Sequence, residues 1–299
     1  MKLSICVITM NRANQLKEAL ESCLACELPQ ETEFIVIDNA STDNTEQVVH
    51  STFVGCDFNY YYEKLDENLG VGGGRNYAYD KACGEYAYML DDDAVIDCSQ
   101  NTMFFLRAIE IMDKHPEFAT LTTQIYDTAW KKNRVACEGP AVADNLFKIQ
   151  MFYGGSHFLR RAFYTASPYL PNKYGYEEIP PSLYAINAGM QNVFCSELLI
   201  IHKPIVNKWD WSEEKNASLL VNGLALQYTI KWMMYPAIVY PLLTLANIVR
   251  VKQHPVKIPN ARRRIKQIKK DVMAKYPVKK KISFLTVVKM FSDFKLSTF

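Results

Sequence analysis

A cysteine framework is missing from this chain. Its eight cysteines are scattered, and the lone C-x-x-C, Cys23 with Cys26, has no second pair at metal-binding spacing. The segment Met1–Thr9 leads directly into a strand pattern and lacks the charged start, apolar core and cleavage site of a secretory leader. Both absences favour a reducing, cytoplasmic compartment and argue against a disulfide-stapled secreted domain. Cys23 and Cys26 fall on the apolar stripe of a helical pattern, so we expect them in the core.

Long uncharged apolar runs are also scarce. The composition, 49% hydrophobic and 22% charged over 299 residues, is that of an ordinary globular protein. The run Trp232–Val249 has 18 residues without a charge, which is the lower limit for a membrane-spanning helix, and Pro236 and Pro241 interrupt it. We expect a broken helical hairpin lying at a membrane interface, with a spanning helix as the alternative.

Charge is distributed unevenly along the chain. The net charge is +2, yet residues 252–299 hold 14 Lys/Arg and 2 Asp/Glu, so the preceding residues are acidic overall. A basic amphipathic helix is predicted over residues 261–276, with Ile265, Ile268, Val272 and Tyr276 on its apolar side. Such a helix suits an anionic membrane surface, and a solvated basic face is the alternative. We expect no nucleic-acid partner, because no recognition module accompanies the charge.

The first ninety residues alternate between strand and helix patterns. This alternation predicts βαβ units, hence an α/β fold with a Rossmann-like, mostly parallel central sheet flanked by helices. Ligands of such sheets bind beyond the carboxyl ends of the strands. The predicted strands are Leu3–Thr9, Glu33–Asp38, Phe58–Glu63 and Tyr86–Leu90, and the helices are Arg12–Cys26, Asp43–Ser51 and Gly74–Ala82.

The pattern is mixed from about Thr120 to Pro204. Strand-like segments surround one helix, and no low-complexity linker comes before residue 205. We therefore expect an α/β domain over residues 1–204 and a helical, basic, membrane-associating extension over residues 205–299. The later predicted strands are Ala119–Ile125, Ile149–Leu159 and Gln191–Ile201, and the helix is Pro181–Ala188.

Three adjacent carboxylates follow the fourth predicted strand. Asp91, Asp92 and Asp93 repel one another and gain nothing from packing, so their position at the end of a buried strand favours a bound cation. Hard divalent ions such as Mg²⁺ or Mn²⁺ prefer carboxylate oxygens and share their shell with substrate phosphates. A solvated acidic turn is the plainer alternative.

A glycine-rich segment lies just upstream, over residues 67–76. Its glycines would let backbone N–H groups approach phosphate oxygens, and Arg75 offers a planar fork to a diphosphate. The segment is neither a Walker motif nor a Rossmann fingerprint, because no Gly-Lys-Ser/Thr follows and it does not follow the first strand. A simple glycine-rich turn is an equal alternative.

Two further acids and a histidine come later in the chain. Glu177 and Glu178 precede a helical pattern, and His202 ends a strand. A histidine after a strand is usually a packing or surface residue. The order of acid triplet, acid pair and strand-terminal histidine is what makes His202 a candidate ligand.

These segments together resemble the GT-A glycosyltransferases of family 2, which are mostly bacterial surface-polysaccharide enzymes. The resemblance covers about residues 3–204. It rests on several motifs in order: ICVITMNR, VIDNASTDNT, ENLGVGGGRNYAYDKACGEYAYMLDDDA, YGGSHFLRRAFY, GYEEIPPSLYAINAG and LLIIHK.

The resemblance implies a donor site and a metal site at the same edge of the sheet. The metal, Mn²⁺ or Mg²⁺, would be held by Asp91, Asp93 and His202. Asp38 would accept a hydrogen bond from the base or ribose, Arg75 would lie near the diphosphate, and Asp92 would reach the ribose or sugar. The full donor-binding set is Thr9, Asn11, Arg12, Asp38, Asn68, Gly73, Arg75, Asp91 and Asp92.

The acid pair would supply the catalytic base. The family's second acid maps to Glu178, with Glu177 beside it. This chain has Glu where the family usually has Asp, and Pro180-Pro181 where Asp-Leu is common. The implied reaction is an in-line displacement that inverts the sugar, with a metal-bound diphosphate as leaving group. Residues 153–157 would line the sugar pocket, although His157 suits a structural role equally well.

The implied donor is a nucleotide-sugar, a UDP-sugar in the first place, and the implied acceptor is a lipid-linked glycan at the inner face of the membrane. Two other classes stay open. A sugar nucleotidyltransferase would need a glycine-rich loop after the first strand, where this chain has Thr9-Met10-Asn11-Arg12. A non-catalytic scaffold of the same fold would not need an intact acid triplet, acid pair and histidine.

Overall fold

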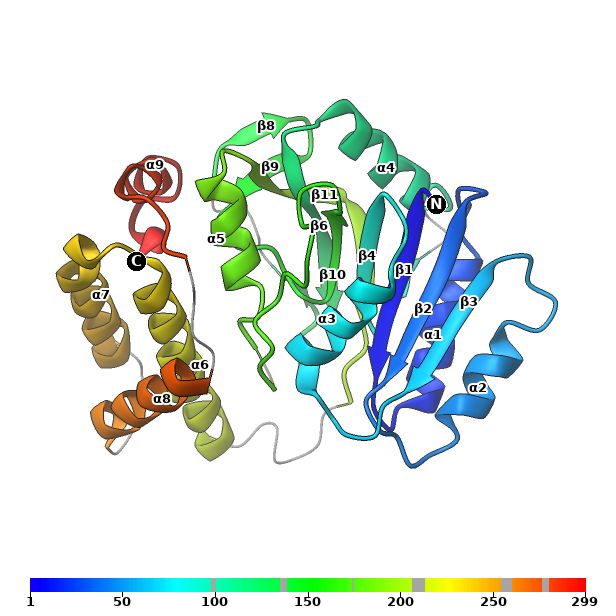
Figure 1. Ribbon diagram of the computed structural model, residues 1–299, viewed down its shortest axis with the longest axis horizontal. Helices are drawn as coiled ribbons and strands as arrows, with labels where there is room; N and C mark the ends of the chain where they lie inside the picture. Colours follow the sequence, from blue (N-terminus) through cyan, green and yellow to red (C-terminus); the bar gives the residue numbers. More distant parts are fainter. Residues whose placement is uncertain (98–100, 135–138, 174, 206–212, 254–259, 276–279) are drawn as a thin grey trace.

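A mixed sheet of eleven strands lies at the centre of the part of the chain that the structure describes (Figure 1). The computed structural model describes residues 1–97, 101–134, 139–173, 175–205, 213–253, 260–275 and 280–299. The first half of the sheet holds β1 (Leu3–Thr9), β2 (Thr32–Asp38), β3 (Asn59–Lys64) and β4 (Tyr86–Asp91), joined by α1 (Ala13–Leu24), α2 (Thr45–Thr52) and α3 (Gly70–Lys81).

The predicted alternation of strands and helices is confirmed in this half. The strands β3, β2, β1 and β4 lie side by side and parallel, as helical crossovers require. In the register, Thr9 lies opposite Asp38 and Ile8 lies opposite Asp91, so three carboxyl ends reach the same edge. The helix α3 starts at Gly70 and not at the predicted Gly74.

Successive residues of β1 pack into two separate cores, because strand side chains alternate between the two faces of a sheet. Leu3 packs in one core, together with Cys23 and Cys26 of the predicted apolar stripe. Cys6 packs on the opposite face, in a core that includes Tyr79 of α3. Burial on both faces explains why these strands read as nearly continuous apolar runs.

The second half of the sheet is built differently. It holds the strands β5 (Ala94–Ile96), β6 (Phe118–Asp127), β7 (Lys132–Asn133), β8 (Ala141–Ala143), β9 (Leu146–Ile149), β10 (Ser156–Arg160) and β11 (Gln191–His202), with the helices α4 (Phe104–Lys114) and α5 (Ile179–Asn187). The helix α4 was not predicted from the sequence, although the buried apolar residues of α4 recur at helical spacing.

The mostly parallel arrangement predicted for the sheet is wrong in this half. The strand β10 lies antiparallel between β4 and β6, and β9 lies antiparallel to β11. The single strand predicted over Ile149–Leu159 is in fact β9 and β10, separated by residues 150–155. Strand direction is set by how the connections run, and a periodic apolar pattern carries no information about it.

The C-terminal helices gather on one side of the molecule, next to α5 and far from α2 (Figure 1). A break at Pro236 and a 3₁₀ turn, η2, end the first of these helices before the second begins, so the broken hairpin is confirmed as a chain path. Among the described residues, no helix has both the length and the apolar character needed to cross a membrane. These elements are α6 (Glu213–Met234), η2 (Ala237–Val239), α7 (Tyr240–Gln253), α8 (Ala261–Lys275), α9 (Phe284–Phe294) and η3 (Lys295–Thr298).

The apolar side of α8 is covered by α6, which corrects the prediction that it faces lipid. Ile265 is 9% exposed and packs with Ala225 of α6, and the Lys269 ammonium lies 3.2 Å from the centroid of the Trp232 ring. The predicted Tyr276 lies outside the described residues. An amphipathic pattern shows that one face is buried, but not which element buries it. Most of the exposed apolar side chains described in this region are on α7 and α9, including Leu242, Leu245, Phe284, Leu285, Val288 and Phe291.

Candidate active site

The carboxyl ends of the strands bring the predicted site residues to one edge of the sheet. Thr9 ends β1 opposite Asp38 at the end of β2, and Asp91 ends β4. In the second half, His202 at the end of β11 lies opposite Asp127 at the end of β6. The antiparallel pairing of β5 with β11 folds the acid triplet back toward the histidine. The register of the apolar strands therefore assembles polar residues that are distant in sequence.

Two of the three acids and the histidine form a group that fits a metal ion. Within the described residues, Asp91, Asp93 and His202 place one ligand atom each within 4.8 Å of one another. The His202 Nε2 atom lies 3.2 Å from Asp93 Oδ1. Carboxylate oxygens select Mg²⁺ or Mn²⁺, and an imidazole nitrogen favours the transition metal of the two. The residues present therefore fit a divalent cation.

Asp93 and His202 shift each other's pKa across their 3.2 Å contact. Burial opposes charge on the imidazole, but the hydrogen bond and the charge of Asp93 outweigh it and raise the pKa of His202. Burial likewise opposes charge on Asp93, and the same contact with His202 still lowers the pKa of that carboxyl. A bound cation would require the neutral form of the His202 imidazole, because a ligating imidazole must be neutral.

Asp127 is a site residue that the sequence analysis missed. It is 1% exposed, and its Oδ2 atom accepts a hydrogen bond from His202 Nδ1 at 2.9 Å. Arg134 Nη2 lies 3.0 Å from the same carboxylate oxygen. A carboxylate behind a histidine fixes the ring so that the other nitrogen faces the metal. The sequence did hold a signal for it. Asp127 comes two residues after the end of the predicted strand Ala119–Ile125, at the position where polar site residues follow the other strands.

Asp92 turns away from the metal group. Its carboxylate accepts hydrogen bonds from Thr9 Oγ1 at 2.7 Å and from Arg12 Nη1 at 2.9 Å. The same guanidinium also reaches Asp93 at 2.9 Å. Burial raises the pKa of Asp92 to about 6, and the charge of Arg12 and the hydrogen bond from Thr9 offset only part of that effect. Asp92 thus connects the acid triplet to Thr9 and Arg12, two residues that are expected to bind the donor.

Arg75 has different partners from those that the resemblance implied. It is 4% exposed, and its guanidinium donates to Asp91 at 2.6 Å, to the Gly154 carbonyl at 2.8 Å and to both Glu177 and Glu178. A guanidinium has five N–H donors, and this one directs them at protein oxygens. Arg75 therefore links the acid triplet to the acid pair, and its place near the donor diphosphate stays a prediction.

The acid pair is buried around that single cation. Glu177 is 2% and Glu178 is 8% exposed. Burial and the neighbouring charge of Glu177 raise the pKa of Glu178 well above the 4.5 of an ordinary glutamate, and Arg75 offsets part of the shift. A Cβ atom at Gly154 would lie 2.0 Å from Glu178 Oε1, so only glycine leaves room for this contact. The more exposed member, Glu178, is better placed to reach a substrate proton.

The glycine-rich segment does not form the predicted phosphate cradle. Residues 70–74 belong to α3, and the backbone N–H groups of Val71 and Gly72 donate to the carbonyls of Lys173 and Asn172. A Cβ atom at Gly72 would lie 1.9 Å from the Leu170 carbonyl oxygen. These glycines allow the helix to pack against the loop before the acid pair. A Cβ atom at Gly73 would lie 2.7 Å from the Cβ atom of Leu69, and the donor-binding role implied for Gly73 stays a prediction.

The remaining donor candidates lie at the far end of the same edge. Asp38 is 1% exposed and accepts hydrogen bonds from the backbone N–H of Ser41 and from the Tyr62 hydroxyl. Asn11 has a left-handed backbone, φ 54°, and its side-chain oxygen accepts from the Thr42 N–H. Asn68 is exposed, and its side-chain oxygen accepts from the Gly70 N–H. His157 is fully buried and contacts the Tyr169 hydroxyl, which suits a structural role better than a role in the sugar pocket.

The profile of Glycosyl transferase family 2 matches residues 4–163, which is more than half of the chain. The chain belongs to glycosyl transferase family 2. The match includes Asp91–Asp93 and Arg75. The match stops before the acid pair and His202, so the roles of those residues are argued from the geometry of this site.

Two curated relatives show the same similarity over shorter segments. The poly-β-1,6-N-acetyl-D-glucosamine synthase of Staphylococcus epidermidis is 30% identical over 120 residues, 40% of this chain and 27% of that protein. The GalNAc(5)-diNAcBac-PP-undecaprenol β-1,3-glucosyltransferase of Campylobacter jejuni is 35% identical over 92 residues, 31% of this chain and 29% of that protein. The matched parts thus span just over a quarter of the length of these relatives.

A solved structure extends the likeness of fold to nearly the whole chain. A mannosyltransferase from Pyrobaculum calidifontis, in complex with GDP-Man and Mn²⁺, superposes with a TM-score of 0.62 at 15% identity. The superposition covers 97% of this chain and 79% of that one. The GT-A architecture implied by the sequence is therefore confirmed, as an α/β mixed sheet flanked by helices and followed by C-terminal helices.

Proposed function

We propose that this family 2 enzyme transfers a sugar from a nucleotide-diphosphate donor to an acceptor hydroxyl, with inversion and with a bound divalent cation. The observation that carries the proposal is the convergence of Asp91, Asp93 and His202 within 4.8 Å at the carboxyl edge of the sheet. Donor sites of open α/β sheets lie at this edge. A UDP-sugar is the first donor to test, and GDP-mannose is the second because the Pyrobaculum mannosyltransferase holds it.

Asp91, Asp93 and His202 would hold the cation, Mn²⁺ or Mg²⁺. When bound, such an ion neutralises the charge that develops on a leaving diphosphate. Asp127 keeps the His202 ring oriented, because it accepts the hydrogen bond from Nδ1. Arg12 and Thr9 hold the carboxylate of Asp92 next to this group, where it would accept a hydrogen bond from a ribose or sugar hydroxyl.

Glu178 is the proposed base. Its carboxylate takes the proton from the acceptor hydroxyl while the acceptor oxygen forms a bond to the anomeric carbon and the bond to the diphosphate oxygen breaks. The electron pair leaves with the nucleoside diphosphate, so one in-line step inverts the sugar and no protein nucleophile is needed. Glu177 and Arg75 tune this base, since one raises its pKa and the other lowers it.

The nucleotide would lie along the ends of β1 and β2. Asp38, Thr9 and Asn11 are already ordered there by hydrogen bonds with Ser41, Asp92 and Thr42, respectively. Preformed polar groups bind a ligand at a lower entropic cost than groups that must be ordered. Asn68, two residues before α3, is exposed and would be the further donor-binding residue on this side.

The C-terminal helices carry the proposed acceptor and membrane side of the enzyme. We propose a catalytic domain over residues 1–204, an extension over residues 205–299, and peripheral binding of that extension to anionic lipid at the cytoplasmic face. Support comes from the excess of basic residues in 252–299 and from exposed apolar side chains on α7 and α9, such as Leu245 and Leu285. The acceptor would be a lipid-linked glycan of surface-polysaccharide synthesis. Sedimentation with neutral and anionic vesicles tests the lipid claim, and equal binding to both would contradict its electrostatic part.

Donor hydrolysis tests the central claim. The purified chain is incubated with UDP-, GDP- and dTDP-sugars in Mn²⁺, in Mg²⁺ and in EDTA, and release of the nucleoside diphosphate is measured. We expect the nucleoside diphosphate to be released from one class of donor, in Mn²⁺ or Mg²⁺ but not in EDTA. Activity that persists unchanged in EDTA would exclude the metal mechanism, and no release from any donor would favour a non-catalytic scaffold.

A further inference from the structure

Two arginines contact the acid triplet, and they differ in how firmly the fold holds them. Arg75 is buried, and oxygens of both acid clusters and of a backbone carbonyl surround its guanidinium. Arg12 directly precedes α1, and 44% of its side chain is exposed. Its guanidinium contacts Asp92 Oδ1 and Asp93 Oδ2, each at 2.9 Å. Of the two arginines, Arg12 is therefore the one that can move without repacking the core.

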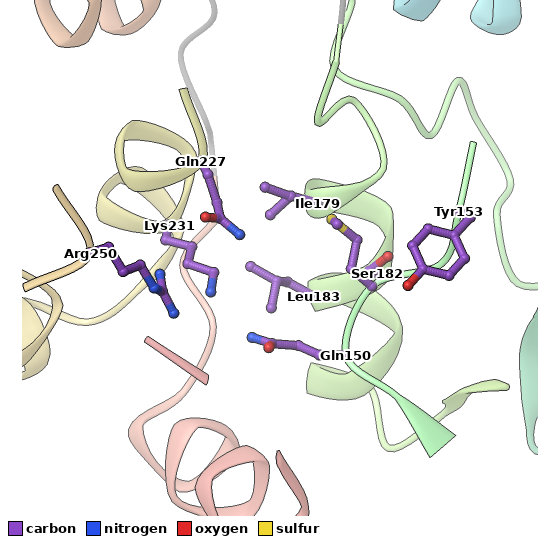
Figure 2. Close-up of a pocket in the computed structure, with 9 residues that line it drawn as sticks. Gln150, Tyr153, Ile179, Ser182, Leu183, Gln227, Lys231 and Arg250 are labelled. Carbon is purple, nitrogen blue, oxygen red and sulfur yellow. The ribbon is translucent and has the colours of Figure 1, made fainter. Parts of the chain in front are cut away.

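The cations on the other side of the molecule contact oxygens that have no part in the proposed site. Figure 2 shows the cavity between α5 and the C-terminal helices, with Lys231 and Arg250 on the same side of it. Lys231 Nζ donates to the Thr298 carbonyl at 3.2 Å, and Arg250 Nη1 donates to the Phe299 oxygen at 2.8 Å. The partners of Arg12 are instead carboxylates next to or within the metal group, so a bound metal ion would change what surrounds Arg12.

The contact between Arg12 and Asp93 opposes the binding of a metal ion. Asp93 Oδ1 lies 3.2 Å from His202 Nε2, and Asp93 Oδ2 contacts Arg12. A metal ion held by Asp93 and His202 would therefore share a carboxylate with a guanidinium, which stays positive at every accessible pH. Two positive charges at such short range repel each other. Arg12 should therefore lower the affinity of the free enzyme for a divalent ion.

Movement of Arg12 would leave neither carboxylate without a partner. Asp92 would still accept the hydrogen bond from Thr9 Oγ1 at 2.7 Å, and Asp93 would still contact His202. This matters because both carboxylates are buried, and a buried polar group that loses its only partner is costly. A guanidinium matches phosphate oxygens with two parallel, charge-assisted hydrogen bonds. A diphosphate at this edge of the sheet would therefore compete well for Arg12.

We propose that Arg12 couples the binding of the metal ion to that of the nucleotide. It opposes the ion while it contacts Asp92 and Asp93, and the opposition ends when its guanidinium turns to the donor diphosphate. The proposal rests on the glycosyltransferase function above and adds to it a positioning residue that makes the two ligands bind better together than apart. The coupling is reciprocal, so the ion also raises the affinity for the nucleotide.

Titration of the full chain with Mn²⁺, followed by paramagnetic resonance of the free ion, tests this coupling with and without UDP. An ion that contacts a diphosphate couples the two ligands by itself, so the decisive quantity is the affinity for Mn²⁺ alone. In Arg12→Gln this affinity should rise about 10-fold, because one charge close to a carboxylate shifts its affinity for a proton by a factor of that size or more. UDP should raise the Mn²⁺ affinity of the wild type more than that of Arg12→Gln.

Two further variants separate charge from shape. Lys17→Gln removes a positive charge from an exposed residue of α1 that pairs with Glu21, and it should bind Mn²⁺ like the wild type. Arg12→Lys keeps the charge without the planar fork, and it should bind Mn²⁺ alone no more tightly than the wild type. Melting temperatures in EDTA show whether the variants are folded.

The outcomes distinguish this proposal from the metal site itself. If Arg12→Gln binds Mn²⁺ alone with unchanged or lower affinity while the wild type binds it measurably, the coupling role of Arg12 is overturned and the metal ligands stand. If neither the wild type nor Arg12→Gln binds Mn²⁺, with or without UDP, the metal site is overturned and this proposal with it.

Discussion

Two carboxylate clusters of this enzyme differ in what compensates their charge. Asp91 and Asp93 meet His202 at the edge of the sheet, and a separate guanidinium contacts one oxygen of each carboxylate, Arg75 at Asp91 Oδ1 and Arg12 at Asp93 Oδ2. Glu177 and Glu178 are buried around Arg75, which stays charged at every accessible pH. The first cluster is therefore suited to a divalent ion, and the second is suited to exchanging a proton.

The two clusters are joined through one residue. Arg75 donates to Asp91 at 2.6 Å and to both glutamates, so the cation that partly neutralises the base also fixes a metal ligand. A single guanidinium thus fixes the spacing between the proposed metal ligands and the proposed base. Identical functional groups acquire different roles because their neighbours favour different counter-charges.

Removal of a metal ligand should have the largest effect. Asp93→Ala takes away a carboxylate oxygen from the metal group, and a Lewis-acid contribution of several kcal/mol corresponds to a loss of turnover of about 10³-fold or more. Mn²⁺ binding, measured by calorimetry, should disappear together with donor turnover. Asp57→Ala, an exposed acid elsewhere on the chain, is the control and should keep both. Mn²⁺-dependent turnover at the original rate in Asp93→Ala would contradict the ligand assignment.

Loss of the base should be the next largest effect. Glu178→Gln keeps the shape of the side chain but removes proton acceptance, so turnover should fall about 10²- to 10⁴-fold while donor affinity stays nearly intact. Steady-state transfer and equilibrium donor binding separate the two quantities. The exposed Glu21→Gln serves as control. If Glu177→Gln is inactive and Glu178→Gln is active, the two roles are exchanged.

Sequence reasoning located one of these clusters more completely than the other. The triplet Asp91–Asp93 ends a strongly apolar strand, so its place at the sheet edge followed from periodicity. The partners of Arg75 did not follow, because its contacts with Glu177 and Glu178 join residues about a hundred positions apart. Such contacts depend on the packing of α3 against the segment before α5, which apolar periodicity does not encode.

The same limit applies at the C-terminal side. The helix α8 was predicted from its spacing of apolar residues, yet its face was assigned to lipid when α6 covers it. Asp127 was missed although it ends a strand beside that of His202, because its role depends on the parallel pairing of β6 with β11. The local sequence pattern predicted the helices and strands, but which of them pack together depends on contacts between distant parts of the chain.

A smaller effect is expected from Asp127, which contacts the proposed metal ligand His202 from behind. Asp127→Asn retains an oxygen that can accept from the Ala129 N–H, but it no longer compels His202 to keep its proton on Nδ1. An amide that donates to Nδ1 would place the proton on Nε2, where it blocks coordination. The Mn²⁺ affinity should fall about 10- to 100-fold. Paramagnetic resonance of free Mn²⁺, without donor, measures this directly. Asp57→Asn is the control, and unchanged affinity would assign Asp127 a purely structural role.

The smallest effect should be a change in pH dependence from Glu177→Gln. Burial and the charge of Glu177 raise the pKa of Glu178, so transfer should be lost as pH falls through a value above that of an ordinary glutamate. The sign follows from the role, because a base works when deprotonated and its raised pKa moves the acidic limb of kcat/KM to higher pH. A neutral amide at position 177 removes the repulsion, so the limb should move to lower pH while turnover at alkaline pH changes little. Glu21→Gln should leave the profile in place. A limb that stays fixed, or moves to higher pH, would show that the two glutamates do not titrate as a coupled pair around Arg75.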